Sequence, residues 1–127
     1  MKKFLSLVLA LTMMMSLVTI NAGAAEFTDD EDITYDEAVA VISEIGVVNG
    51  YEEGDFKPQN GLTRQAAAKI ICNLILGPTT AAELHADTAP FSDVPVSNDL
   101  SGYIAYCAKE GIISGYADGT FRPTNGL

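Results

Sequence analysis

Apolar residues recur at helical spacing in three stretches of the chain beyond residue 34. The first stretch begins with a capping-box pair, Thr34 and Glu37, and stops at Gly46, a residue typical of helix ends. Its apolar positions are three or four residues apart, which places them on one face of a helix. That face is predicted to consist of Ala38, Val41, Ile42 and Ile45.

A structured loop and a second helix are predicted to follow. The loop carries residues that permit or fix turns, together with Phe56, an apolar side chain that can fold the loop back onto the core. Thr63 is placed to cap the second helix, which Gly77-Pro78 ends. Its buried stripe is predicted to be Ala67, Ile70, Ile71, Leu74 and Ile75. One unit therefore reads helix, loop, helix.

The chain repeats itself with a shift of 65 residues. Residues 46–62 and 111–127 share nine identities, including four glycines, a tyrosine, a phenylalanine and a proline. Phe27-Thr28-Asp29 and Phe91-Ser92-Asp93 open the two units. The third apolar stretch is the first helix of the second unit, with Tyr103, Ile104, Cys107 and Ala108 on its apolar face. Because the second unit stops before its second helix, we expect a fragment of a longer protein.

The N-terminal residues resemble an export signal. Lys2 and Lys3 precede an apolar run from Phe4 to Ile20, which small residues follow. An uncleaved anchor is the alternative, but the run is interrupted by Ser6, Thr12 and Ser16 and is shorter than the ~20 residues that a membrane span needs. The predicted organisation is a signal peptide over 1–24, a first repeat over 25–89 and a second, truncated repeat over 90–127.

Composition limits the classes of partner. The 127 residues carry a formal charge of −10, which falls to −12 once Lys2 and Lys3 are removed with the signal. Such an acidic chain is a poor match for nucleic-acid phosphates or anionic membranes. Binding of an anionic ligand must therefore depend on a few placed Arg and Lys residues, and the length allows a single small domain.

The repeated motifs are similar to those of a known family. Phe-x-Asp at the start of each unit, Gly-Tyr-x-x-Gly-x-Phe-x-Pro in each loop and Leu62-Thr63-Arg64 before the second helix resemble the S-layer homology (SLH) domain of bacterial surface proteins. The resemblance implies an all-α fold of helix-loop-helix repeats, here part of an incomplete pseudo-threefold helical bundle. It also implies a secreted, non-catalytic module without cofactors at the cell wall or S-layer.

In that family, the grooves between repeats bind a secondary cell-wall polysaccharide that often carries an anionic pyruvyl ketal, and other S-layer proteins are further partners. Arg64 follows the capping Thr63, where a guanidinium fork and helix N-terminal amides converge on a carboxylate. Gly50 and Gly115 would allow close approach of a sugar, or serve as turn residues. Two further candidates, Lys57 and Arg122, add positive potential or are plain loop charges.

Two departures from the family pattern affect this site. The motif Thr-Arg-Ala-Glu stands here as Thr63-Arg64-Gln65-Ala66, without the Glu that completes a capping box. Asn98 and Asp99 occupy the positions of a frequent His-Trp pair, and the chain contains no Trp, so no sugar can stack on an indole ring. Tyrosine rings offer a weaker platform or belong to the core.

Catalytic and metal chemistry find little support in the sequence. His85, the one histidine, is predicted to be exposed in a linker, and Cys72 and Cys107 lie on apolar helix faces as a disulfide or as buried thiols. No zinc or calcium spacing is present. Two further functions remain open: targeting of a secreted polysaccharide hydrolase, and protein-protein packing by repeats that have lost glycan binding.

Overall fold

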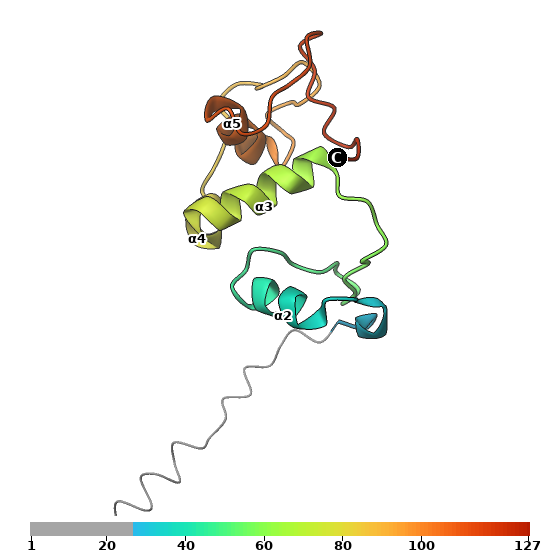
Figure 1. Cartoon of the computed structure of the whole chain (residues 1–127). Helices are drawn as coiled ribbons and strands as arrows, with labels where there is room; N and C mark the ends of the chain where they lie inside the picture. Colours follow the sequence, from blue (N-terminus) through green and yellow to red (C-terminus); the bar gives the residue numbers. More distant parts are fainter. Residues whose placement is uncertain (1–26) are drawn as a thin grey trace, which may run out of the picture.

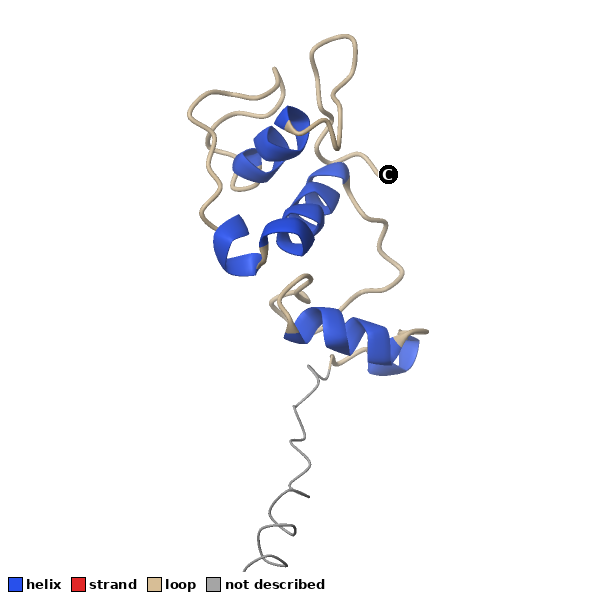
Figure 2. Cartoon of the chain, turned by 60° about the vertical axis from the view of Figure 1, so that its left-hand side comes forward, coloured by secondary structure: helices blue, strands red, loops and turns tan. Residues whose placement is uncertain are grey.

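The computed structural model describes residues 27–127, so the predicted signal peptide lies outside the described residues. Its elements follow in the order η1 (Asp30–Asp32), α2 (Asp36–Glu44), α3 (Arg64–Leu76), α4 (Pro78–Ala81) and α5 (Ser101–Lys109) (Figure 1). Within these residues, extended pairing is limited to two isolated bridges, and long loops precede α3 and α5 (Figure 2). The predicted all-α class is confirmed.

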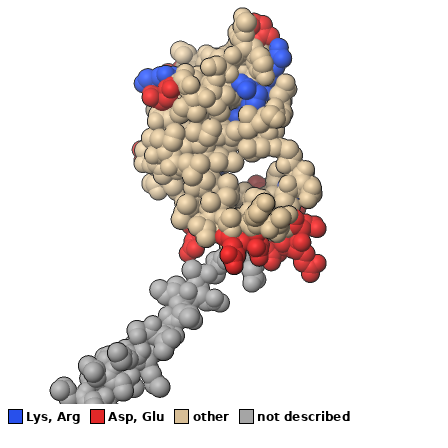
Figure 3. Space-filling view, viewed as in Figure 1, with Lys and Arg blue, Asp and Glu red and all other residues tan. Residues whose placement is uncertain are grey.

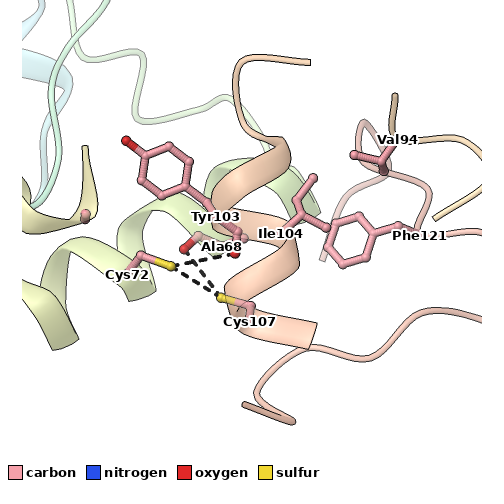
Figure 4. Packing of buried hydrophobic residues seen from close by; sticks show 8 residues of the cluster. Ala68, Cys72, Val94, Tyr103, Ile104, Cys107 and Phe121 are labelled. Carbon is pink, nitrogen blue, oxygen red and sulfur yellow. Dashed lines mark hydrogen bonds between the residues drawn. The ribbon is translucent and has the colours of Figure 1, made fainter. Parts of the chain in front are cut away.

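The core lies between α3 and α5, which belong to different sequence repeats. Side chains from both helices and from the second loop pack there (Figure 4). Its fully buried members are Ala68, Cys72, Ala81, Val94, Ile104, Cys107 and Phe121. The predicted inward face of α5 is confirmed at Tyr103, Ile104 and Cys107. The two repeats therefore form one joint hydrophobic core.

Helix α2 lies apart from that core (Figures 1 and 2). It has no buried residue, and Val41 and Ile45 are 57% and 55% exposed. Its C-terminal end is held by Asn73 of α3, whose Nδ2 donates hydrogen bonds to the carbonyls of Gly46 and Val47 at 3.3 and 3.0 Å. The predicted apolar face of α2 is therefore largely exposed, because α3 packs against α5 instead.

The start of α2 also differs from the prediction. Tyr35 is its N-cap residue and no side chain caps it, so the expected capping box of Thr34 and Glu37 does not form. The buried side chain of Ile33 fixes the chain between η1 and α2, and the first helical hydrogen bond starts at the Tyr35 carbonyl. The predicted stop at Gly46 is confirmed, with a left-handed φ of 74°.

The buried stripe of α3 is displaced from the predicted one. Ala67 is buried as expected, but Leu74 and Ile75 are 60% and 55% exposed. The face of α3 that packs against α5 is instead formed by Ala68 and Cys72, which lie one turn apart. Beyond Gly77, which adopts a φ of 79°, the predicted linker begins with the short helix α4, started by Pro78.

Candidate functional site

The Phe-x-Asp motif of each repeat holds the loop of the same repeat. The carboxylate of Asp29 accepts hydrogen bonds from the amides of Phe56 and Lys57, both at 2.7 Å. Asp93 accepts the equivalent pair from residues 121–122, both at 2.8 Å. The hydrogen bond donated by the backbone amide of Phe56 is the main cause that lowers the pKa of Asp29. The backbone amide of Phe121 has the same effect on the pKa of Asp93. These aspartates are loop anchors rather than free ligands.

Gly50 and Gly115 make room for the phenylalanine of the same motif. A Cβ atom on Gly50 would overlap the Phe27 ring and lie 2.6 Å from the Asp55 carbonyl oxygen. A Cβ atom on Gly115 would meet the Phe91 ring in the same way. Neither glycine has a positive φ, so close packing, not backbone conformation, is the reason for glycine here.

Each loop folds its cation over its own tyrosine. Lys57 Nζ lies 4.4 Å from the centroid of the Tyr51 ring and pairs with Glu53 and Asp55, both at 3.4 Å. In the second loop, the Arg122 guanidinium lies 4.1 Å from the Tyr116 ring and pairs with Asp118 at 3.1 Å. The backbone of both cationic residues is left-handed, with φ values of 55° and 57°. The two predicted site cations are therefore equivalent in structure as well as in sequence.

Asp118 carries the carboxyl group of the second loop, and its pKa is lowered. It accepts hydrogen bonds from the Thr120 hydroxyl at 2.6 Å and from the Thr120 amide at 3.0 Å. The hydroxyl bond is the main cause that lowers the pKa of Asp118 to about 2, and the Arg122 guanidinium contributes further. Asp118 is thus ionised at neutral pH beside Arg122.

Arg64 points away from the first loop and into the second. Its Nε donates to the Phe121 carbonyl at 2.8 Å, and Nη2 donates to the Ser114 carbonyl at 2.7 Å. The guanidinium also lies 4.6 Å from the Phe121 ring and 5.0 Å from the Tyr116 ring. An Arg side chain has five N–H donors, so three remain after these two bonds. Arg64 joins the repeats and keeps donors for a further contact.

The first amides of α3 are already bound. The Arg64 amide donates to the Asn125 carbonyl at 2.9 Å, and the Gln65 amide donates to the Pro123 carbonyl at 3.0 Å. The Ala66 amide donates to the Thr63 hydroxyl at 3.3 Å, which confirms the predicted cap. The sequence predicts that free amides at the start of α3 converge with the Arg64 guanidinium on a ligand. This prediction is wrong here, because these amides already donate hydrogen bonds to carbonyls of the second loop.

A groove of about 560 Å³ lies between the first loop and the N-terminal half of α3. It contains three of the predicted site residues, Thr63, Gly50 and Lys57, whereas the other three belong to the second loop and its contacts. Figure 3 shows the molecule hollowed in this region. The lining comprises residues 47–51, 56–58 and 60–62 together with Thr63, Ala66, Lys69, Ile70 and Leu100.

Lys69 is a cationic groove residue that the sequence analysis did not include among the candidate site residues. It lies on α3 two turns after Thr63, on the face that also carries Ala66 and Ile70. Among the described residues it forms no ion pair, in contrast to Lys57. The spacing of 63, 66, 69 and 70 is the signal that could have revealed this face, because residues three or four apart share one side of a helix.

The charges of the described chain are unevenly distributed. On the face in Figure 3, carboxylates gather at the end formed by η1 and α2, while the other end shows lysine and arginine side chains together with further carboxylates. His85 is exposed as predicted, with 79% of its side chain accessible. Residues 27–127 contain no group of three His, Cys, Asp or Glu side chains arranged for a metal, and none of their helices is long and apolar enough to cross a membrane.

Comparison with known proteins shows the family of the chain. The S-layer homology domain family matches residues 26–68 and 90–127, more than half of the chain. The chain is 32% identical over 80 residues to a cellulosome-anchoring protein of Acetivibrio thermocellus, covering 63% of this chain and 18% of that protein. It is 27% identical over 127 residues to a surface layer protein of Brevibacillus choshinensis, covering 98% of this chain and 11% of that protein. No solved structure matches the chain.

The chain belongs to the S-layer homology domain family. It is a cell-surface anchoring module that acts at the bacterial cell wall or S-layer. It spans less than a fifth of the length of the relatives named above.

Proposed function

We propose that the chain anchors a secreted protein by binding an anionic secondary cell-wall polysaccharide in the groove beside α3. The observation that carries this proposal is the position of Lys69, a cation without an ionic partner among residues 27–127, on the wall of a groove of about 560 Å³. A ligand carboxylate that reaches Lys69 gains a charge-assisted hydrogen bond. That volume also lies within the range of typical ligand pockets.

Within a largely apolar lining, several polar and aromatic groove residues can hold a sugar. Asn49 and Asn60 supply amide donors and acceptors, and the half-exposed ring of Tyr51 offers an aromatic face. Lys57 contributes positive potential, although part of its charge is balanced by Glu53 and Asp55. A pyruvyl ketal, with its carboxylate beside a sugar ring, suits this combination.

Arg64 at the start of α3, together with Arg122 and Gly115 of the second loop, is proposed as a secondary contact area. Both guanidinium groups lie against Tyr116, and Arg64 retains donors beyond its two carbonyl bonds. Because Arg64 also holds the repeats together, its removal would weaken wall binding even without a ligand contact. Lys69 is therefore the cleaner residue for a test of binding.

The experiment is cosedimentation of the full chain with purified Gram-positive cell walls, before and after acid extraction of the accessory polysaccharide. We expect binding to untreated walls and its loss on extracted walls. Lys69→Gln should weaken binding at least roughly tenfold, since a hydrogen bond from a charged group contributes on the order of 1.5–3 kcal/mol and each 1.4 kcal/mol is a factor of ten. Lys109→Gln is the matched control, because Lys109 is an exposed cation at the end of α5, outside the groove.

Equal binding to both kinds of wall would exclude the polysaccharide and favour packing against surface proteins. Equal weakening by Lys69→Gln and Lys109→Gln would show a general charge effect and exclude the groove. Rising salt should reduce specific binding, because screening weakens contacts between exposed charges.

A further inference from the structure

The two cysteines of the chain meet at the interface between the repeats. Cys72 lies on α3 of the first repeat and Cys107 on α5 of the second, and their Sγ atoms are 3.7 Å apart (Figure 4). Both side chains are fully buried, and both are free thiols. The chain contains no other cysteine, so each thiol has one possible intramolecular partner.

Each sulfur also contacts the backbone of the opposite helix. Cys72 Sγ lies 3.7 Å from the Tyr103 carbonyl oxygen, and Cys107 Sγ lies 3.7 Å from the Ala68 carbonyl oxygen. The helices are therefore close together at this point, with no side chain between the sulfurs. A disulfide bond requires an S–S distance of about 2.05 Å, so closure needs the sulfurs to approach by less than about 2 Å.

We propose that Cys72 and Cys107 form an oxidation-dependent cross-link between the two repeats. The oxidant is a disulfide of low molecular weight or of a partner oxidoreductase. One cysteine thiolate attacks that disulfide, forms a mixed disulfide and releases the first thiolate. The second cysteine then attacks the mixed disulfide, forms the Cys72–Cys107 bond and releases the second thiolate. Two protein thiols are oxidised, one disulfide is reduced to two thiols, and the two protons pass to the released thiolates.

Burial makes this reaction conditional on opening of the interface. Burial is the main cause that raises the pKa of Cys72 to about 12, and it also raises the pKa of Cys107. Few thiolates exist in the closed state at neutral pH, and an external disulfide cannot reach either sulfur. The cross-link should therefore form slowly in the native protein and faster when α3 and α5 separate transiently.

The disulfide bond would link α3 of the first repeat covalently to α5 of the second repeat. The bond would form a covalent loop from residue 72 to residue 107. It would lie within the core that also contains Phe121, the second-loop residue bound by Arg64. Closing a loop of this size restricts the unfolded chain and raises stability. This proposal concerns the core and stands independently of glycan binding in the groove.

The test uses the reduced full chain, incubated with oxidised glutathione in water and in low guanidinium, and then returned to water. We expect an intact mass 2 Da below that of the reduced chain, a linked peptide pair containing Cys72 and Cys107, and a Tm at least about 5 °C higher. Dithiothreitol should reverse all three changes. Oxidation should be several-fold faster in low guanidinium than in water.

Two variants serve as controls. Cys107→Ala should give only a mixed disulfide or a dimer and show no rise in Tm. A variant in which both cysteines are alanine should keep its Tm with and without the oxidant. The proposal is overturned if both thiols stay reduced in low guanidinium, if the wild-type product is a dimer or a stable mixed disulfide, or if the intramolecular bond leaves Tm unchanged or lower.

Discussion

Arg64 Nε donates a hydrogen bond of 2.8 Å to the carbonyl oxygen of Phe121, and the same guanidinium lies 4.6 Å from the Phe121 ring. One side chain of the first repeat thus holds both the backbone and the ring of a residue 57 positions later. Because Phe121 is fully buried, this contact connects the surface of the second loop to the shared core. Arg64 is therefore a residue of the repeat interface.

We expect Arg64→Ala to lower the free energy of unfolding by about 2 kcal/mol, since hydrogen bonds from a charged group contribute on the order of 1.5–3 kcal/mol. Arg64→Lys should restore less than half of this loss, because an ammonium group cannot reproduce the fork that reaches two carbonyls. Denaturant unfolding measures both changes. Arg122→Ala, which breaks an exposed pair with Asp118, is the control and should have a much smaller effect. Equal effects would contradict the assigned role of Arg64.

The loop anchors Asp29 and Asp93 should make stability depend on pH in the acid range. Their pKa values are lowered in the folded chain, mainly by the amides of Phe56 and Phe121. A lowered pKa contributes stability that is present above the unfolded value of about 4 and is lost as pH falls through the folded value. Asp118, with a pKa of about 2, adds to the same loss between about pH 4 and pH 2.

The check is Tm as a function of pH between 7 and 2. Asp93→Asn should lower Tm at pH 7, because an amide oxygen replaces a carboxylate that accepts two backbone amides. Its Tm curve should also be flatter below pH 4 than that of the wild type. Parallel curves for the two proteins would contradict the anchoring role of Asp93.

Gly115→Ala should destabilise the second loop through steric overlap. The added methyl group meets the Phe91 ring and lies 2.9 Å from the Thr120 carbonyl oxygen. Overpacking of this kind costs about 1–3 kcal/mol, which thermal unfolding would detect as a lower Tm. Gly126→Ala is the matched control in the same loop region, because nothing lies within 4 Å of its added Cβ atom. A Tm loss confined to Gly126→Ala would contradict the packing role of Gly115.

Local sequence signals predicted the features that depend on neighbouring residues. Thr63 caps α3, and Gly46 and Gly77 end their helices with left-handed φ values, because these effects arise within a few residues of the chain. The repeat also predicted that Lys57 and Arg122 would be equivalent. The all-α class followed from the resemblance of the repeated motifs to the S-layer homology domain, with which the helical spacing of the apolar positions agrees.

Long-range packing decided what the sequence left undetermined. Periodicity marks an apolar face but does not choose its partner, so it could not show that α3 packs with α5 while the Val41 face of α2 stays exposed. The same limit applies to the site. Thr63 and Arg64 are adjacent in sequence, yet one lines the groove and the other reaches the second loop, because neighbours on a helix point in different directions.

The boundaries of the sequence repeats differ from the boundaries of the packed unit, because the core is formed by α3 of the first repeat and α5 of the second. Helix α3 closes the first repeat, but its apolar side is covered by α5, and residues 62–65 pair with residues 123–127 of the second loop. The first repeat therefore has two unlike parts: α2, which lies outside the shared core, and α3, which forms that core together with α5 of the second repeat. A cut at the boundary between residues 89 and 90 would leave no intact core on either side, whereas a boundary drawn before α3 would keep the core whole.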